Sequence, residues 1–226
     1  MPTIDRERLM SLLHTEQSRY VAENPKSAAL YADSDHLFAR VPMTWMNKWA
    51  GGFPLGFTSA RGAHITTLDG RDLVDFALGD TGAMAGHSPE PLVRAVSERI
   101  GTLGGVTTMM PTPDAEWVAA EMTRRFGLSQ WSFSLSATDA NRWLLRLVRL
   151  ATGRSKILFF SYGYHGTVDE SFVVVGPDGA AMSRPGNVAP AIDPALTSRV
   201  VEFNDIEALR RELAHGDVAA VMTEPA

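Results

Sequence analysis

Residues Ser132 to Gly153 read SFSLSATDANRWLLRLVRLATG. The first four residues alternate polar and apolar side chains, which predicts a short strand over 132–135. Beyond the turn that follows, apolar or small side chains recur at helical spacing: Ala140, Trp143, Leu144, Leu147, Val148 and Ala151. The stretch therefore predicts a strand, a tight turn and a helix, which is the unit from which α/β folds are built.

The turn in this stretch has the chemistry of an anion site. The first N–H groups of a helix have no acceptor within the helix, and the helix dipole favours negative charge at that end. The hydroxyl groups of Ser136 and Thr138 would add two hydrogen-bond donors. We therefore expect a phosphate cup at Ser136–Asn141.

Composition excludes several classes of function. The chain has 226 residues, is 45% hydrophobic and carries a net charge of −5, without a basic block for nucleic acid. It has no cysteine, which excludes disulfides and thiolate metal sites, and its six histidines are not paired at ligand spacing. We expect no metal site. The first residues lack an apolar signal core and there is no long apolar run, so a cytoplasmic protein that neither enters nor crosses a membrane is expected.

The N-terminal part, 1–78, is predicted to form a small α/β segment. Residues 3–23 mix leucines with charges and predict a helix. Residues 63–68 and 73–76 flank Asp69-Gly70 and predict a β-hairpin. The segment 37–49, rich in methionine and tryptophan, is expected to fill a core, with the lining of an apolar pocket as the alternative.

Residues 79–226 predict the first part of a larger α/β domain. Strands are expected at 156–160, 200–203 and 218–222, separated by helices, so the fold class is a mostly parallel sheet flanked by helices. The proline-rich stretch 176–198 is expected to be a long functional loop.

Three polar segments come at the carboxyl ends of the predicted strands, where parallel sheets bind ligands. They are Ser136–Asp139, Tyr162–Gly166 and Thr223–Pro225. The chain has no Walker A sequence, no Gly-x-Gly-x-x-Gly after a strand and no Gly-x-Ser-x-Gly around Ser136. A phosphate cup, an aromatic loop and a carboxylate together would suit a flat, phosphorylated, heteroaromatic cofactor.

These segments resemble the class III pyridoxal-5′-phosphate aminotransferases. Ser136-Ala137-Thr138-Asp139-Ala140-Asn141 is similar to the Ser-Gly-Thr-Glu-Ala-Asn cup of that family, Tyr164-His165-Gly166 to its Tyr-His-Gly, and Glu224-Pro225 to its Glu-Pro pair. Further matches lie upstream in the same order: Arg61-Gly62, Asp69-Gly70, Asp75-Phe76 and Gly86-His87-Ser88-Pro89. The resemblance covers about residues 37–226 and implies the large domain of fold type I, incomplete, with pyridoxal 5′-phosphate (PLP) as cofactor.

The resemblance also implies roles for individual residues. Ser136, Ala137 and Thr138 would hold the cofactor phosphate, Tyr164 would stack on the pyridine ring beside His165, and Glu224 would lie on the substrate side. Two residues depart from the family pattern. Ala137 replaces a glycine and so requires a backbone without positive φ, and Asp139 replaces a longer glutamate. The family also implies a homodimer with shared active sites.

The catalytic residues are not identified in this sequence, apart from Glu224 as a candidate. Covalent catalysis with PLP needs a Schiff-base lysine. The three lysines of the chain, Lys26, Lys48 and Lys156, do not occupy the family's position, which comes after the Glu-Pro pair. The sequence is therefore expected to be the N-terminal half of a longer enzyme.

The expected function is a transaminase that transfers an amino group between an amine or amino acid and a keto acid. Where the aminomutase-like branch carries a carboxylate-binding arginine, residues 42–49 read PMTWMNKW. This favours an apolar or aromatic substrate beside Trp45, together with Glu224. The alternatives are an aminomutase of the glutamate-1-semialdehyde type and a non-catalytic fragment that binds a phosphate ligand.

Overall fold

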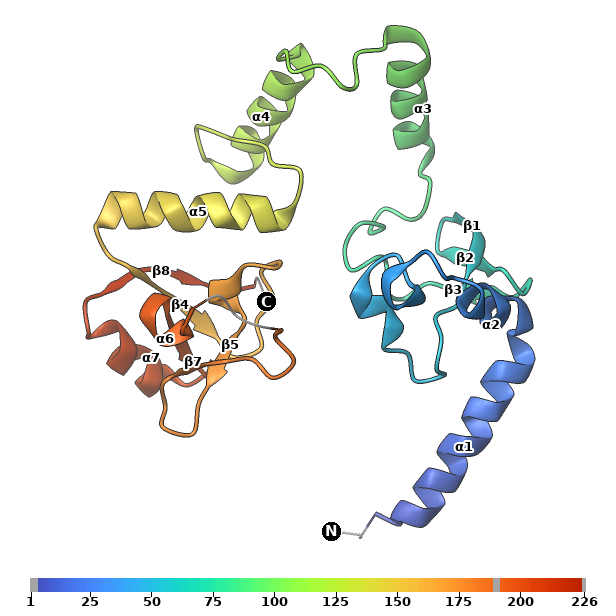
Figure 1. Ribbon diagram of the computed structural model, residues 1–226. Coiled ribbons are helices and arrows are strands. Elements are labelled where there is room, and N and C mark those ends of the chain that lie inside the picture. Colours follow the sequence, from blue (N-terminus) through green and yellow to red (C-terminus); the bar gives the residue numbers. More distant parts are fainter. Residues whose placement is uncertain (1–3, 189–191, 225–226) are drawn as a thin grey trace. The chain divides into compact units, whose positions relative to one another are not determined.

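The computed structural model describes residues 4–188 and 192–224, in two compact units that divide between Pro111 and Thr112 (Figure 1). The expected boundary after residue 78 falls inside the first unit. There, His87 and Gly62 exchange two backbone hydrogen bonds of 2.8 and 2.9 Å, and His87 Nε2 lies 2.7 Å from Asp75 Oδ2. These contacts tie the residues after 78 back to the hairpin. The division into functional domains at 1–78 and 79–226 stays a prediction.

The first unit contains a three-stranded antiparallel sheet and several helices. The strands follow the order β1 (Phe57–Arg61), β2 (His64–Thr67) and β3 (Asp72–Val74). The helical elements are α1 (Arg6–Glu23), α2 (Pro25–Ala32), η1 (Phe38–Arg40), η2 (Thr44–Asn47), α3 (Glu90–Glu98) and η3 (Arg99–Leu103). The predicted N-terminal helix and the hairpin between β2 and β3 are confirmed, and β1 is an additional strand.

Asp69 in the hairpin turn also caps helix α2. The carboxylate of Asp69 accepts hydrogen bonds from the N–H groups of Lys26 at 2.7 Å and Ser27 at 3.2 Å, and from the Ser27 hydroxyl at 2.6 Å. Because these N–H groups open helix α2, the carboxylate satisfies donors that the helix leaves unpaired.

The expectation that residues 37–49 fill a core is wrong. Met43, Trp45 and Trp49 are 53%, 62% and 46% exposed. The segment forms the short 3₁₀ turns η1 and η2 rather than a long element. Such short turns do not gather their side chains onto one continuous apolar face.

The second unit contains the parallel sheet. Its central strand β4 (Lys156–Phe160) pairs in parallel with β7 (Ser198–Val201) on one side and β8 (Val218–Met222) on the other, so the predicted parallel sheet is confirmed. A separate antiparallel pair is formed by β5 (Val173–Val175) and β6 (Ala181–Ser183). The remaining helical elements are α4 (Pro113–Phe126), α5 (Ala137–Thr152), η4 (Asp169–Ser171), α6 (Pro194–Thr197) and α7 (Ile206–Leu213).

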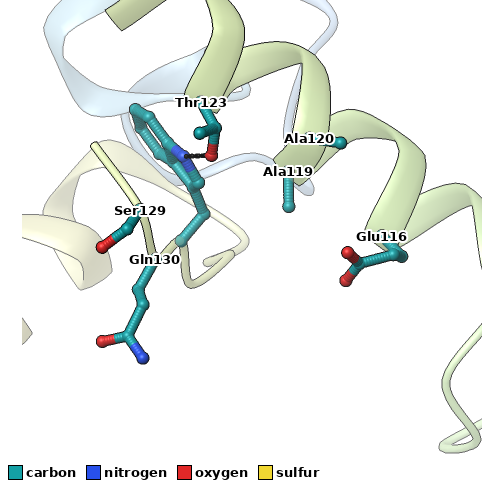
Figure 2. A pocket seen from close by; sticks show the side chains of 7 residues that line it. Glu116, Ala119, Ala120, Thr123, Ser129 and Gln130 are labelled. Carbon is teal, nitrogen blue, oxygen red and sulfur yellow. Dashed lines mark hydrogen bonds between the residues drawn. The ribbon is translucent and has the colours of Figure 1, made fainter. Parts of the chain in front are cut away.

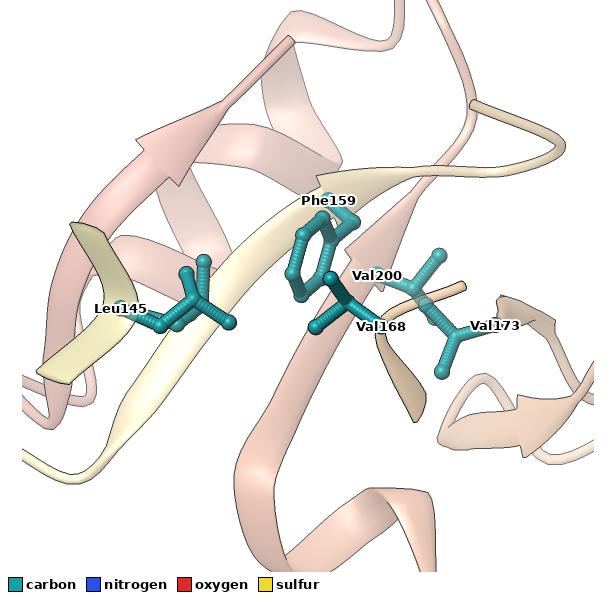
Figure 3. Packing of buried hydrophobic residues seen from close by; sticks show 6 residues of the cluster. Leu145, Phe159, Val168, Val173 and Val200 are labelled. Carbon is teal, nitrogen blue, oxygen red and sulfur yellow. The ribbon is translucent and has the colours of Figure 1, made fainter. Parts of the chain in front are cut away.

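Both faces of strand β4 are buried, so its sequence is continuously apolar rather than alternating. Ile157 and Phe159 contribute to a cluster with Leu145 of α5, which Figure 3 shows with Val168, Val173 and Val200. Leu158, between them, packs in a second cluster with Ala208 of α7. Successive side chains of a strand point to opposite faces, so α5 and α7 cover opposite faces of the sheet (Figure 1).

Three expectations for this unit need correction. Residues 132–135 are not a strand: Phe133 is 57% and Leu135 103% exposed, and among the described residues no strand pairs with them. Within 176–198, the short elements β6 and α6 interrupt the expected loop, while Pro190 lies outside the described residues. The strand expected at 200–203 begins and ends two residues earlier, as β7.

Candidate functional site

The site begins at the N-terminus of α5, where the predicted turn is confirmed. Ser136 is the N-cap: its hydroxyl accepts a hydrogen bond from the Asp139 N–H at 3.2 Å and donates to the Asp139 carboxylate at 3.1 Å. Ala137 and Thr138 are the first two helical residues, so their N–H groups have no acceptor within the helix. Ala137 is helical, without a positive φ, so the alanine meets the backbone requirement at this position.

The aromatic loop 162–166 lies directly against this helix start. The hydroxyl of Thr138 accepts a hydrogen bond from the Thr167 N–H at 3.0 Å. Gly166 has a φ of +80°, and a Cβ added there would collide with Thr138. The side-chain amide of Asn141 donates to the carbonyl of His165 at 2.8 Å. Three successive loop residues are therefore fitted onto the first turns of α5.

The end of β8 reaches the same loop from the other side. The Oε1 atom of Glu224 accepts a hydrogen bond from the backbone N–H of Tyr164 at 2.5 Å. The three segments thus meet as predicted, up to Glu224, although the first of them follows residues 132–135, which are not a strand; Pro225 lies outside the described residues.

The two ring side chains of the loop have different environments. Tyr164 is 59% exposed, with the Phe172 ring at a centroid distance of 6.3 Å, so much of its surface is available to a ligand. His165 is buried beside Phe159, and among the described atoms its Nε2 has no hydrogen-bond partner. Burial lowers the pKa of His165, and the negative charge of Glu224 opposes this effect. The imidazole is therefore neutral at neutral pH.

Six of the seven predicted site residues lie in the second unit, on the elements just described: Ser136, Ala137, Thr138, Tyr164, His165 and Glu224. Trp45 belongs to η2 of the first unit, and its part in the site stays a prediction. Asn141 was part of the recognised motif, but it was not predicted to contact the loop. Its spacing of three residues from Thr138, on one helix face, is the signal that could have identified it.

Lys156 is placed away from the cup. It opens β4, at the amino end of the strand, and its Nζ lies 3.6 Å from Asp217 Oδ2. A five-residue strand is about 16 Å long, so this lysine lies at the opposite edge of the sheet from the loop. Lys26 and Lys48 belong to the first unit. That none of the three is the Schiff-base lysine stays a prediction.

A hollow of about 730 Å³ lies elsewhere in this unit, between α4 and residues 129–131 (Figure 2). The indole N–H of Trp131 donates to the Thr123 hydroxyl at 3.0 Å across its floor. Among the residues that line the hollow, Glu116 is the one with an ionisable side chain. The hollow shares no lining residue with the cup, the loop or Glu224, so the candidate site is defined by the convergence of segments and not by this hollow.

Two further features can be stated for the described ranges, 4–188 and 192–224. No helix there has the length and hydropathy required to cross a membrane. In the same ranges, no three histidine or acidic side chains are grouped so as to hold a metal ion.

Comparison with known proteins gives consistent matches. The family model "Aminotransferase class-III" matches residues 45–226. A glutamate-1-semialdehyde 2,1-aminomutase of Akkermansia muciniphila is 36% identical over 179 residues, which are 77% of this chain and 41% of that protein. The chain thus spans less than half the length of this curated relative.

Solved structures match as well. A glutamate-1-semialdehyde aminomutase from Pseudomonas aeruginosa PAO1 has a TM-score of 0.90 and 46% identity, covering 98% of this chain and 49% of that chain, and was also solved as a variant in complex with PMP. An omega-transaminase from Sphaerobacter thermophilus has a TM-score of 0.78 and 28% identity, covering 88% of this chain and 47% of that one.

Proposed function

This chain belongs to the aminotransferase class-III family, and from that premise we propose that the protein containing it transfers amino groups with PLP bound at the start of α5. The fold is that of the fold-type-I PLP enzymes, and the family together with its PMP-bound structural relative implies PLP as the cofactor. The observation that carries the proposal is the convergence of the Ser136 cup, the Tyr164 loop and Glu224 through direct hydrogen bonds.

The residues present fit the phosphate of this cofactor. The N–H groups of Ala137 and Thr138 point out of the first turn of a 16-residue helix, where the dipole favours an anion. The hydroxyl of Thr138 accepts from the loop and keeps its own proton to donate. The carboxylate of Asp139, beside the cup, accepts a hydrogen bond from the Ser136 hydroxyl.

The residues of the loop fit the ring of the cofactor. The exposed side chain of Tyr164 offers an aromatic face for stacking next to the phosphate position. When bound, the cofactor supplies an electron sink that weakens a bond at the amine carbon of the substrate. The chain's own residues bind and orient it, and the covalent lysine is proposed to lie in the remainder of the longer protein, as in the expectation from sequence.

Binding can be tested by titrating the cofactor-free protein with PLP and following its visible absorbance. Thr138→Val keeps the shape of the side chain but removes its hydroxyl, and is expected to weaken PLP binding about tenfold. Thr152→Val is the matched control, because Thr152 ends the same helix and its hydroxyl bonds only near that end, donating to the Val148 carbonyl at 2.7 Å and accepting from the Arg154 N–H at 3.2 Å. Equal affinities of the two variants would contradict the proposed cup.

For the reaction, we propose transamination with an apolar or aromatic amine donor. The amino group passes to the carbonyl carbon of a keto acid, and the donor carbon takes the oxygen, so that two electrons move from donor to acceptor. The support is the exposed Trp45 and the lack of an arginine in 42–49. The arginine nearest to this segment in sequence is Arg40, and its guanidinium donates a hydrogen bond to the Ala32 carbonyl at 2.9 Å.

A second candidate is an aminomutase that moves the amino group within glutamate 1-semialdehyde. It is favoured by the 46% identity to the Pseudomonas aeruginosa aminomutase over 98% of this chain. The two reactions differ in their need for an acceptor. Conversion of glutamate 1-semialdehyde without a keto acid would support the aminomutase, whereas turnover of hydrophobic amines only with a keto acid would support the transaminase. Unchanged activity of Trp45→Ala on those amines would count against the apolar substrate site.

A further inference from the structure

Three side chains hold the aromatic loop by hydrogen bonds to its backbone and to that of Thr167, which follows it. Glu224 binds the N–H of Tyr164, Asn141 binds the carbonyl of His165 and Thr138 binds the N–H of Thr167. The side chain of Tyr164 takes part in none of these three bonds. The backbone on both sides of the Tyr164 ring is therefore fixed, while the ring itself is left for a ligand.

Asn141 has a position that its helix does not explain. It lies in the second turn of α5, past the capping positions, where asparagine is a poor helix former. It shares one helix face with Thr138 and with Leu145, which is 2% exposed in the core cluster against β4. An apolar residue would continue this buried face. The polar side chain instead donates across a sequence separation of 24 residues to the loop.

Glu224 has a matching position at the end of β8. Its Oε1 atom is engaged with the Tyr164 N–H, at a sequence separation of 60 residues. To accept this hydrogen bond, residue 224 needs a side-chain oxygen atom but does not need to transfer a proton. This distinguishes holding the loop from acting on the substrate.

Resting on the proposed function, we propose that Asn141 is a positioning residue, which together with the Glu224 acceptor sets the Tyr164 ring at the correct height for the pyridine ring above the phosphate cup. Loss of the Asn141 amide leaves the His165 carbonyl without its partner and lets the loop move away from α5. The cup, which is formed by the helix N-terminus, stays in place. The effect is thus expected on the ring and not on the phosphate.

The test uses the intact protein, freed of cofactor, and three measurements: affinity for PLP, affinity for inorganic phosphate and circular dichroism of the bound cofactor. Asn141→Leu keeps a similar volume without the donor and is expected to weaken PLP binding about tenfold, to change the dichroism and to alter phosphate binding by less than about twofold. Asn141→Gln, which restores an amide donor, should recover part of both signals.

Asn187→Leu is the matched control. Asn187 belongs to the same unit and also donates through its amide, to the Ser183 hydroxyl at 3.2 Å, but it contacts neither the loop 162–166 nor α5 in the bonds described. It is expected to leave all three measurements unchanged.

Glu224 separates positioning from proton transfer. Glu224→Gln keeps an oxygen acceptor for the Tyr164 N–H and should preserve the PLP affinity and dichroism, whereas Glu224→Leu should lose both about as strongly as Asn141→Leu. PLP affinity and dichroism of Asn141→Leu equal to those of the unaltered protein would overturn the inference. So would an equal loss of phosphate and PLP affinity, because the cup itself would then be damaged. Failure of the unaltered protein to bind PLP would instead overturn the proposed function.

Discussion

The two edges of the parallel sheet are built on opposite principles. At the amino ends of the strands, the Arg199 guanidinium of β7 contacts Asp217 at 2.6 and 2.8 Å and Glu212 at 2.7 Å, and Lys156 of β4 also approaches Asp217. At the carboxyl ends, single hydrogen bonds hold a loop, and the His165 Nε2 is left unpaired. The edge at the amino ends pairs ionised side chains with one another. Among the described residues, the edge at the carboxyl ends has an unpaired imidazole nitrogen and the exposed ring of Tyr164.

The difference separates the edge that stabilises the sheet from the edge at which we propose that the cofactor binds. Arg199 and Glu212 are mostly buried, and the Arg199 contacts raise its pKa and lower the pKa of Asp217 to about 2. Such a paired cluster fixes the strand register but offers nothing to a substrate. The opposite edge has fewer bonds to each loop residue, and it is there that a ligand could add its own contacts.

The largest effect is expected from Arg199→Ala. It leaves the carboxylates of Asp217 and Glu212 together without their guanidinium, so the free energy of unfolding should fall by about 2 kcal/mol. Urea denaturation measures this change. PLP affinity at temperatures where the variant is folded should be unaltered, and a parallel loss of affinity would show that the two edges are not independent.

A smaller effect, confined to the binding edge, is expected from Gly166→Ala. The added Cβ would collide with Thr138, and the alanine would have to adopt a φ of +80°. PLP binding should therefore weaken about tenfold. Gly179→Ala is the control, since Gly179 has a φ of +81° with open space around its Cβ position. If both variants lose affinity equally, backbone strain and not the contact between loop and helix is responsible.

The smallest effect is a pH dependence of the amino edge. The pKa of Asp217 is lowered from 3.8 to about 2, chiefly by the hydrogen bond from Arg199. Because the folded pKa is below the unfolded one, its stabilisation is complete above about pH 4 and is lost as the pH falls through about 2. The difference in urea midpoint between the unaltered protein and Asp217→Asn should therefore shrink from pH 5 towards pH 2. A difference that stays constant over this range would contradict the ion pair.

Local sequence patterns predicted the elements that depend on nearby residues. The cap at Ser136, the helix after it, the buried strand β4 and the Asp69-Gly70 hairpin all follow from neighbouring side chains and turn chemistry. The parallel direction of the strands was also predicted, because alternating strands and helices favour a parallel sheet.

Patterns that need a distant partner were less informative. The alternation at 132–135 is that of a strand, but a strand exists only where a neighbour pairs with it, and none of the described residues does so. The apolar side chains of 37–49 were expected to be buried, yet their burial depends on what covers two short turns. In both cases composition does not specify the partner.

The sequence by itself determined the helix that begins after Ser136, the buried apolar strand β4 and the motifs of the family, because each depends on residues that are close together in the chain. Only the tertiary structure decided that Asn141 holds the His165 carbonyl and that Glu224 holds the Tyr164 N–H. Those contacts join residues 24 and 60 positions apart. They exist because parallel pairing of β4 with β8, and packing of α5 on the same sheet, bring the ends of separate segments to one edge.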